Sequence, residues 1–88
     1  MNIYVVVNTY YDCNEVEVRT FESKKDAQDY AVHAYIEDSE YWSKDITKED
    51  IAKFREGLEK DNCVHIDYTV DYSIYETALQ FEKQGDQE

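Results

Sequence analysis

Acidic side chains recur at helical spacing between residues 26 and 40. Asp26, Asp29, His33, Glu37 and Glu40 are separated by three, four, four and three positions. At about 100° per residue, these positions share one stripe of a helix. Like charges four residues apart weaken a helix slightly, and a stable surface helix usually mixes in lysines. Such a stripe can either bind a cation or face a basic surface.

Two narrower chemistries would use residues of the same types. Asp29, His33 and Glu37 are spaced to hold a divalent ion on one helix, but an isolated helical stripe is typical of a solvated face, so we predict no metal site. Cys63 and His65 share one face of an expected strand, yet the pattern supplies no third group to orient the imidazole and no oxyanion pocket. We therefore predict a protein that is not an enzyme and uses no cofactor.

Four further carboxylates fall on expected strands. Asp67 and Asp71 lie on one face of the stretch HIDYTVDYSI, roughly 13 Å apart along an extended chain. Glu15 and Glu17 are predicted to point outward from their strand, with the valines that follow them facing the core. Together with the helical stripe, these carboxylates predict an extended anionic surface interleaved with tyrosine. Lys and Arg side chains that normally hold phosphates would find complementary charges there.

Hydrophobic periodicity predicts the elements that carry these side chains. Residues 2–11 and 15–21 alternate as two strands joined by a short Asp/Asn turn. The first is apolar on both faces and is therefore expected at the centre of its sheet. Helices are predicted from the N-cap Ser23 to about Trp42, and from the N-cap Thr47 to Asn62.

The last apolar stretch alternates and then changes phase. Even positions are predicted to face the core as far as Ile74, after which the large apolar residues Tyr75, Leu79 and Phe81 stand at odd positions. Residues 73–76 lack Gly, Asn and Pro, so we predict a β-bulge near Ile74-Tyr75 in place of a turn. The residues of the expected core face are Ile66, Tyr68, Val70, Tyr72 and Ile74.

The predicted fold class is α+β. We expect a small antiparallel sheet of three to four strands with two helices on one face, in the order β-β-α-α-β, with the last strand bent or split. Residues 1–82 are expected to form a single domain, and 83–88 a polar, frayed C-terminal tail.

Net charge limits the partners. The 88 residues include 9 Lys and Arg against 21 Asp and Glu, giving a net charge of −12. This balance excludes direct binding to nucleic acid or to an anionic membrane, and favours basic protein surfaces. The N-terminal run MNIYVVV has neither the basic segment nor the apolar length of a leader, so we expect a cytoplasmic protein whose Cys13 and Cys63 are free thiols.

The whole chain resembles, as a type, the small acidic inhibitors encoded by phages and mobile elements, which include anti-CRISPR and anti-restriction proteins. The resemblance lies in its size, in the helical carboxylates, in Asp67 and Asp71, and in the patterns NIYVVVNTYYD and FESKKDAQDYA. It implies a stoichiometric inhibitor that occupies the basic nucleic-acid-binding surface of a defence nuclease, such as a CRISPR effector, in the host cytoplasm. Neither turnover nor a cofactor would be involved.

A second hypothesis stays open at this point. If helices cover only one face of the sheet, the other face is available for contact, and tyrosine is enriched at protein interfaces. The protein would then be a small adaptor or a homodimerisation module that uses a Tyr-rich sheet face, in which Tyr68 and Tyr72 are the residues to test.

Overall fold

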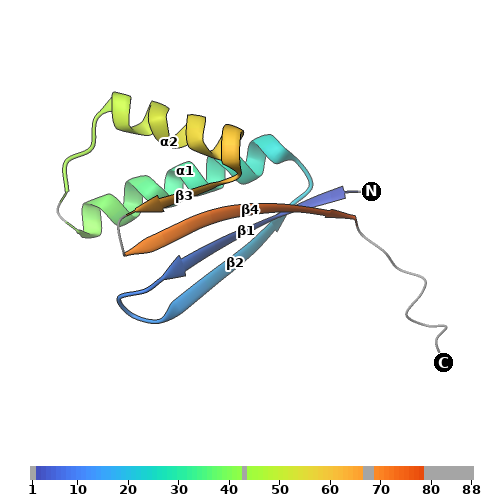
Figure 1. Ribbon diagram of the computed structural model, residues 1–88, viewed down its shortest axis with the longest axis horizontal. Coiled ribbons are helices and arrows are strands. Elements are labelled where there is room, and N and C mark those ends of the chain that lie inside the picture. Colours follow the sequence, from blue (N-terminus) through green and yellow to red (C-terminus); the bar gives the residue numbers. More distant parts are fainter. Residues whose placement is uncertain (1, 43, 67–68, 79–88) are drawn as a thin grey trace.

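The computed structural model of the protein describes residues 2–42, 44–66 and 69–78. Its elements are β1 (Asn2–Tyr10), β2 (Glu15–Phe21), α1 (Lys24–Tyr41), α2 (Lys48–Asp61), β3 (Cys63–Ile66) and β4 (Val70–Ala78). The strands form one antiparallel sheet in the order β2-β1-β4-β3, and both helices lie on the same face of it (Figure 1). The predicted α+β class is confirmed, and β1 lies between its hairpin partner and the last strand as expected.

Capping side chains set the helix ends where the sequence predicts them. Ser23 Oγ accepts a hydrogen bond from the N–H of Asp26 at the start of α1. Thr47 and Asp50 form a capping box at the start of α2, in which each side chain accepts from the other's backbone N–H. Asn62 ends α2 in the left-handed conformation, with φ of 60°.

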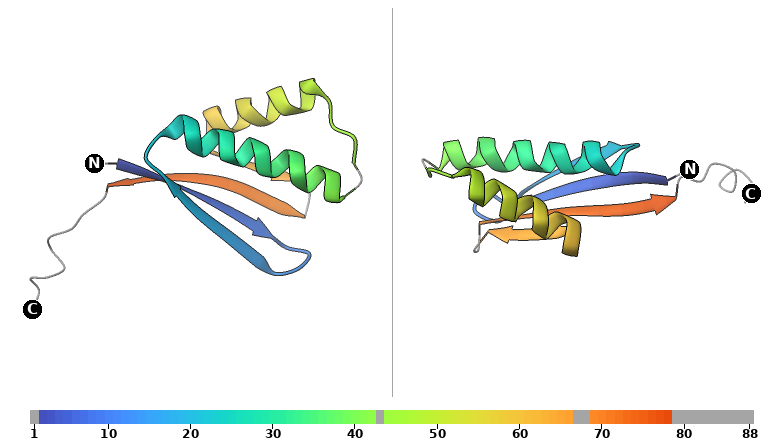
Figure 2. Two further views of the ribbon diagram at one scale, coloured as in Figure 1. Left: turned by 180° about the vertical axis from the view of Figure 1, so that it is seen from behind. Right: turned by 90° about the horizontal axis from the view of Figure 1, so that it is seen from above.

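The core lies between the sheet and the two helices, with α1 over β1 and β2 and α2 over β3 (Figure 2). The rings of Tyr35 on α1 and Phe54 on α2 stack with centroids 4.4 Å apart. Tyr72 of β4 meets both rings edge-on, at 6.2 Å from Tyr35 and 5.1 Å from Phe54. This aromatic cluster joins both helices to the sheet, in the offset and edge-to-face geometries that aromatic pairs prefer.

The predicted bulge near Ile74-Tyr75 is wrong. β1 and β4 pair in unbroken register from Asn2 opposite Ala78 to Tyr10 opposite Val70. The last stretch is instead split earlier, between β3 and β4, where the Thr69 N–H donates to the Ile66 carbonyl at 2.9 Å. From residue 75 to residue 78 every side chain is exposed, so neither face needs to be apolar there. The phase change therefore marks the end of the covered sheet.

The predicted orientation of β2 is also wrong. Glu17 pairs with the fully buried Asn8, so Glu15 and Glu17 lie on the helix-facing side. Val16 and Val18 lie on the uncovered face of the sheet and are 59% and 55% exposed. The alternation correctly separates the two faces of β2. It does not identify the helix-facing one, because β2 is an edge strand that is largely exposed on both faces.

The structure also bears on the expected location, the two cysteines and the predicted core face of the last strand. None of the helices in the described ranges combines the length and the apolar character that a membrane span requires. Cys13 is exposed and Cys63 is half-buried, and both are free thiols. The predicted core residues Val70, Tyr72 and Ile74 are buried, whereas Tyr68 and the C-terminal tail lie outside the described residues.

Candidate functional site

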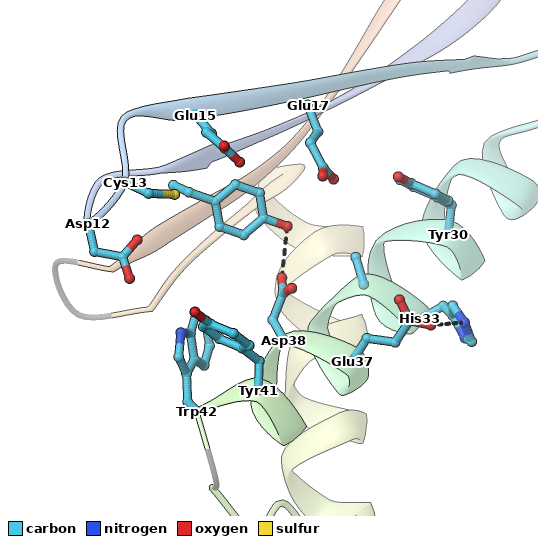
Figure 3. A pocket seen from close by; sticks show the side chains of 12 residues that line it. Asp12, Cys13, Glu15, Glu17, Tyr30, His33, Glu37, Asp38, Tyr41 and Trp42 are labelled. Carbon is cyan, nitrogen blue, oxygen red and sulfur yellow. Dashed lines mark hydrogen bonds and ion pairs between the residues drawn. The ribbon is translucent and has the colours of Figure 1, made fainter.

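A pocket of about 430 Å³ lies between the β1–β2 hairpin and the C-terminal half of α1 (Figure 3). Its lining combines aromatic rings and carboxylates from both sides, together with Cys13, His33 and Ala34. The aromatic residues are Tyr10, Tyr30, Tyr41 and Trp42. The carboxylates are Asp12, Glu15, Glu17, Glu37 and Asp38. We call this set of residues the acidic pocket.

The hairpin places three of these side chains on one side of the sheet. Tyr10, at the end of β1, is directly opposite Glu15 in the register, and Glu17 follows two residues later on the same face. The turn between the strands contains Asn14 with φ of 58°, a left-handed conformation that Asn adopts more easily than most residues. Asp12 lies in that turn, at the edge of the pocket.

The last three turns of α1 supply the opposite wall. Residues three or four apart share a helix face, and this spacing relates Tyr30, Ala34, Asp38 and Trp42 as well as Glu37 and Tyr41. Trp42 is the C-cap residue, whose N–H donates to the Asp38 carbonyl at 3.1 Å. One helix end therefore presents two large rings and the Asp38 carboxylate toward the hairpin, whereas the Glu37 carboxylate turns toward His33 (Figure 3).

Asp38 is the fixed centre of the pocket. Its Oδ2 accepts hydrogen bonds from the Tyr10 hydroxyl at 2.8 Å and from the Tyr72 hydroxyl at 2.6 Å. Burial, followed by the hydrogen bond to Asp38, raises the pKa of Tyr10 and of Tyr72 well above the usual tyrosine value. Both hydroxyls therefore remain protonated donors at neutral pH, and the carboxylate is held in one position.

The lining of the pocket contains five carboxylates. The charge of Glu17 adds to the rise in the pKa of Tyr10, after burial and Asp38. Glu37 pairs with His33 on the outer side of α1, with 3.0 Å between Oε2 and Nε2 and both side chains exposed. Within the part of the chain that the structure describes, the pocket is lined by no Lys or Arg. An approaching cation would therefore meet several carboxylates, with the Arg19 guanidinium over the Tyr30 ring as a neighbouring cation at the edge of the pocket.

Asn8 lies next to the acidic pocket, and its amide is poorly satisfied. Its side chain is fully buried, and neither amide atom makes a hydrogen bond of normal geometry. It is on the helix-facing side of β1, beside Glu17 across the strand and two residues from Tyr10. The amide is near enough to the Tyr10 hydroxyl to act as a weak hydrogen-bond partner, which lowers the pKa of that hydroxyl against the larger effects of burial and Asp38. A buried amide of this kind costs about 1–3 kcal/mol when its hydrogen bonds are unmade.

Three of the eight predicted contact residues, Glu15, Glu17 and Glu37, come together in the acidic pocket. Asp29 does not join them. It binds the Lys25 ammonium at 2.9 Å and the Arg55 guanidinium at 3.1 Å. These hydrogen bonds hold its pKa below the usual range of an aspartate, and its charge is offset within the chain.

The other predicted carboxylates are dispersed. Asp26 and Glu40 are exposed on α1 but do not line the pocket, and Asp26 is roughly 16 Å along the helix axis from Glu37. Asp71 points to the uncovered face of the sheet, where it accepts the Tyr11 hydroxyl at 2.5 Å and contacts His65 Nδ1. Asp67 lies outside the described residues. Among the residues that the structure describes, three of the predicted carboxylates therefore meet at the acidic pocket and the others lie apart from it.

Sequence reasoning missed Asp12, Asp38 and the aromatic walls. A signal for Asp38 was present, because it follows Ala31 by seven residues and Ala34 by four, in the buried register of α1. A carboxylate in that register needs hydrogen-bond donors from the opposite layer. The tyrosines of the sheet supply them, but their contact with Asp38 depends on strand order.

Metal and nucleophilic sites have limited support. Across residues 2–42, 44–66 and 69–78, no group of three or more His, Cys, Asp and Glu side chains is placed to hold a metal ion. Asp71 supplies an orienting partner for His65, which the sequence pattern did not reveal. Cys63 and His65 are both on the uncovered face of the sheet, where Cys63 is opposite Ser73 and His65 is opposite Asp71 in the register.

Comparison with known proteins gives no relative from which a function can be transferred. No model of a known protein family, no curated protein and no solved structure matches the chain.

Proposed function

We propose that this protein is a non-catalytic, stoichiometric inhibitor that binds the basic surface with which a defence nuclease, such as a CRISPR effector or a restriction enzyme, holds nucleic acid. The contact is made by the acidic pocket and by the exposed carboxylates around it. The protein itself binds neither nucleic acid nor membrane, needs no cofactor and acts in the cytoplasm of the host cell.

One observation carries this proposal. Glu15, Glu17 and Glu37, together with Asp38, are drawn from separate elements to one aromatic-lined pocket, in a chain of net charge −12. Like charges brought together in this way reduce stability, so a partner that supplies positive charge would gain from neutralising them. Electrostatic steering toward such a partner would also accelerate association at low salt.

The test compares two triple variants of equal charge. Glu15→Lys, Glu17→Lys and Glu37→Lys change the pocket, whereas Glu56→Lys, Glu59→Lys and Asp61→Lys change exposed positions of α2. Each triple variant makes the net charge less negative by the same amount. Circular dichroism establishes that both fold. Inhibition is measured as DNA cleavage by purified CRISPR effectors and restriction enzymes, with increasing amounts of each protein.

The expected result is inhibition that is complete near one equivalent of the wild type and of the α2 variant, and lost for the pocket variant. Affinity capture of the nuclease should also weaken steeply between about 50 mM and about 500 mM salt, because exposed charges are screened over about 8–10 Å at physiological ionic strength. Capture that is indifferent to salt and to the pocket substitutions would reject the proposal.

A homodimer through the uncovered sheet face is the alternative function. Val16, Val18 and Tyr75 are each more than half exposed there, and Asp71 is the only carboxylate among the described strand residues of that face. Two chains of net charge −12 would repel each other least through this surface. Tyr72, one of the two residues to test under the adaptor hypothesis, is fully buried under the helices, so it takes no part in this alternative.

Solution mass distinguishes the alternative from a monomeric inhibitor. Light scattering of the wild type at increasing concentration should give twice the chain mass if the sheet face dimerises. The variant Val16→Thr, Val18→Thr keeps β-branched side chains and removes apolar surface, so it should return the mass to that of one chain. A wild type that stays monomeric at every concentration would remove the alternative.

A further inference from the structure

We propose that the acidic pocket binds the side chain of one arginine of the partner protein, with its guanidinium among the aromatic rings and its charge neutralised by the surrounding carboxylates. This inference rests on the proposed function, because it names the group that the pocket recognises on the basic surface. The volume of about 430 Å³ lies within the range of about 300–1,000 Å³ that is typical of ligand pockets.

The aromatic walls favour a planar cation. A guanidinium stacks on aromatic faces and is more weakly hydrated than an ammonium, so it loses less on entering a half-enclosed site. Tyr10, Tyr41 and Trp42 line the space between the hairpin and α1, and Figure 3 shows the rings of Tyr41 and Trp42 below the hairpin turn. Tyr41 is 84% exposed. Its ring therefore contributes little to the core, and its face is open to a partner.

The chain already places a guanidinium against one of these walls. The Cζ atom of Arg19 lies 5.5 Å from the ring centroid of Tyr30, within the distance at which a cation is attracted to an aromatic face. Arg19 is on the same side of β2 as Glu17, two residues further along the strand. The edge of the pocket therefore shows, with the protein's own arginine, the contact that we infer for the partner's.

The carboxylates provide the counter-charge, and that of Asp38 is held in a fixed position. Asp38 is held by the hydroxyls of Tyr10 and Tyr72, and Glu15 and Glu17 approach from the hairpin. Arginine presents donors in a rigid fork that pairs with carboxylates in a bidentate manner, and several acceptors around one space suit that fork. Lysine presents a compact, strongly hydrated charge, which gains less from flat aromatic walls.

The buried amide of Asn8 is an independent observation beside the same pocket. Asn8 is fully buried behind the lining residues Glu17 and Tyr10, and neither of its polar atoms makes a hydrogen bond of normal geometry, although the amide interacts weakly with the Tyr10 hydroxyl. Unpaired buried polar groups in native structures are few, and each calls for a reason. Rearrangement of Glu17 or Tyr10 around a bound guanidinium would bring a hydrogen-bonding partner within reach of this amide.

Fluorescence of the single tryptophan tests the inference directly, because Trp42 lines the pocket. The probe is the acetylated and amidated peptide Gly-Gly-Arg-Gly-Gly, titrated into the full chain at low salt. The same peptide with citrulline, which is neutral and nearly isosteric, is the matched control, and a third peptide carries lysine. We expect saturable quenching or a spectral shift with arginine, affinity weaker by roughly tenfold or more with citrulline, and intermediate affinity with lysine.

Neutral variants then locate the site without disturbing the fold. Glu17→Gln with Glu37→Gln should lower the affinity for the arginine peptide by roughly tenfold, whereas Glu56→Gln with Glu59→Gln on α2 should leave it unchanged. The inference would be overturned if the arginine peptide bound no more tightly than the citrulline or the lysine peptide. It would also be overturned if the two double variants bound the arginine peptide with equal affinity. If the lysine variants of the pocket still abolish nuclease inhibition while the arginine peptide does not bind, the proposed function stands and the arginine pocket fails.

Discussion

The hydroxyl of Tyr72 donates a hydrogen bond to Oδ2 of Asp38 at 2.6 Å, linking the middle of the sheet to the C-terminal half of α1. Tyr72 also packs edge-on against Phe54 of α2. One side chain therefore contributes to the aromatic core with its ring and positions a pocket carboxylate with its hydroxyl. Stability and the geometry of the candidate site are coupled through this residue.

Replacing Tyr72 by Phe should separate the two contributions. The ring and its aromatic contacts are kept, while one of the two hydrogen bonds to Asp38 is lost. Because a hydrogen bond to a charged acceptor contributes about 1.5–3 kcal/mol, we expect the free energy of unfolding to fall by about that amount in urea denaturation. The control is Tyr75→Phe, an exposed tyrosine of the same strand, which should change stability by less than about 0.5 kcal/mol. Equal stability of Tyr72→Phe and the wild type would show that the hydrogen bond contributes nothing.

Asn8 predicts an opposite effect, namely stabilisation by an apolar substitution. Asn8→Val removes a fully buried amide whose atoms make no hydrogen bond of normal geometry, and it adds a β-branched side chain to the central strand. We expect the free energy of unfolding to rise by about 1–2 kcal/mol. Asn8→Asp, which buries a charge at the same position, should lower it. If the amide is needed when an arginine binds, Asn8→Val should also weaken binding of the arginine peptide while it raises stability.

The sequence carried enough information for the fold class, the helix ends and the central position of β1, because these depend on local periodicity and on capping residues such as Ser23, Thr47 and Asn62. The sequence did not show which side of β2 faces the helices. Alternation on an edge strand separates two faces, but it leaves open which face the helices cover. For this reason the predicted orientation of Glu15 and Glu17 was the reverse of the observed one, and both lie on the side of the sheet that forms the acidic pocket.

The acidic pocket was only partly predictable for a related reason. Helical spacing found Glu37 but could not distinguish it from Asp29, whose charge is offset by Arg55 of the other helix. Such pairs are set by how α1 and α2 pack, which a periodic pattern does not encode. Asp38 was not predicted because it lies outside the stripe of carboxylates on α1, in the buried register of the helix. Its importance lies in contacts with Tyr10 and Tyr72, from strands far apart in the sequence.

Asp71 on the uncovered face predicts a pH-dependent contribution to stability. Partial burial tends to raise its pKa, but hydrogen bonds from Tyr11 and His65 outweigh that effect and leave the pKa below the usual aspartate value. A carboxyl whose pKa is lower in the folded state stabilises the fold above its unfolded value of about 3.9, and this stabilisation is lost as the pH falls through the lowered folded value. Tyr11→Phe should therefore raise the pKa of Asp71, measured by NMR titration of its side chain.

The same variant should destabilise the protein at pH about 7 and differ less from the wild type at pH about 2, where the carboxyl is protonated in both states. Urea denaturation at the two pH values measures this. Tyr75→Phe, on the same face, is the control and should leave the pKa of Asp71 unchanged. A destabilisation by Tyr11→Phe that is equal at both pH values would mean that Tyr11 stabilises the fold by packing alone.

Gly57 offers a double-mutant test of how α2 meets β3. A Cβ atom at this position would lie 3.0 Å from Cγ2 of Val64, closer than ordinary van der Waals contact. Replacing Gly by Ala inside a helix stabilises it by about 1 kcal/mol, but here the new methyl group would displace Val64. We expect Gly57→Ala to be neutral or destabilising in the wild type, and to stabilise the Val64→Ala background by about 1 kcal/mol. Urea denaturation of the four proteins gives the coupling energy, and a value near zero would mean that the glycine is not required for close approach of the helix to the strand.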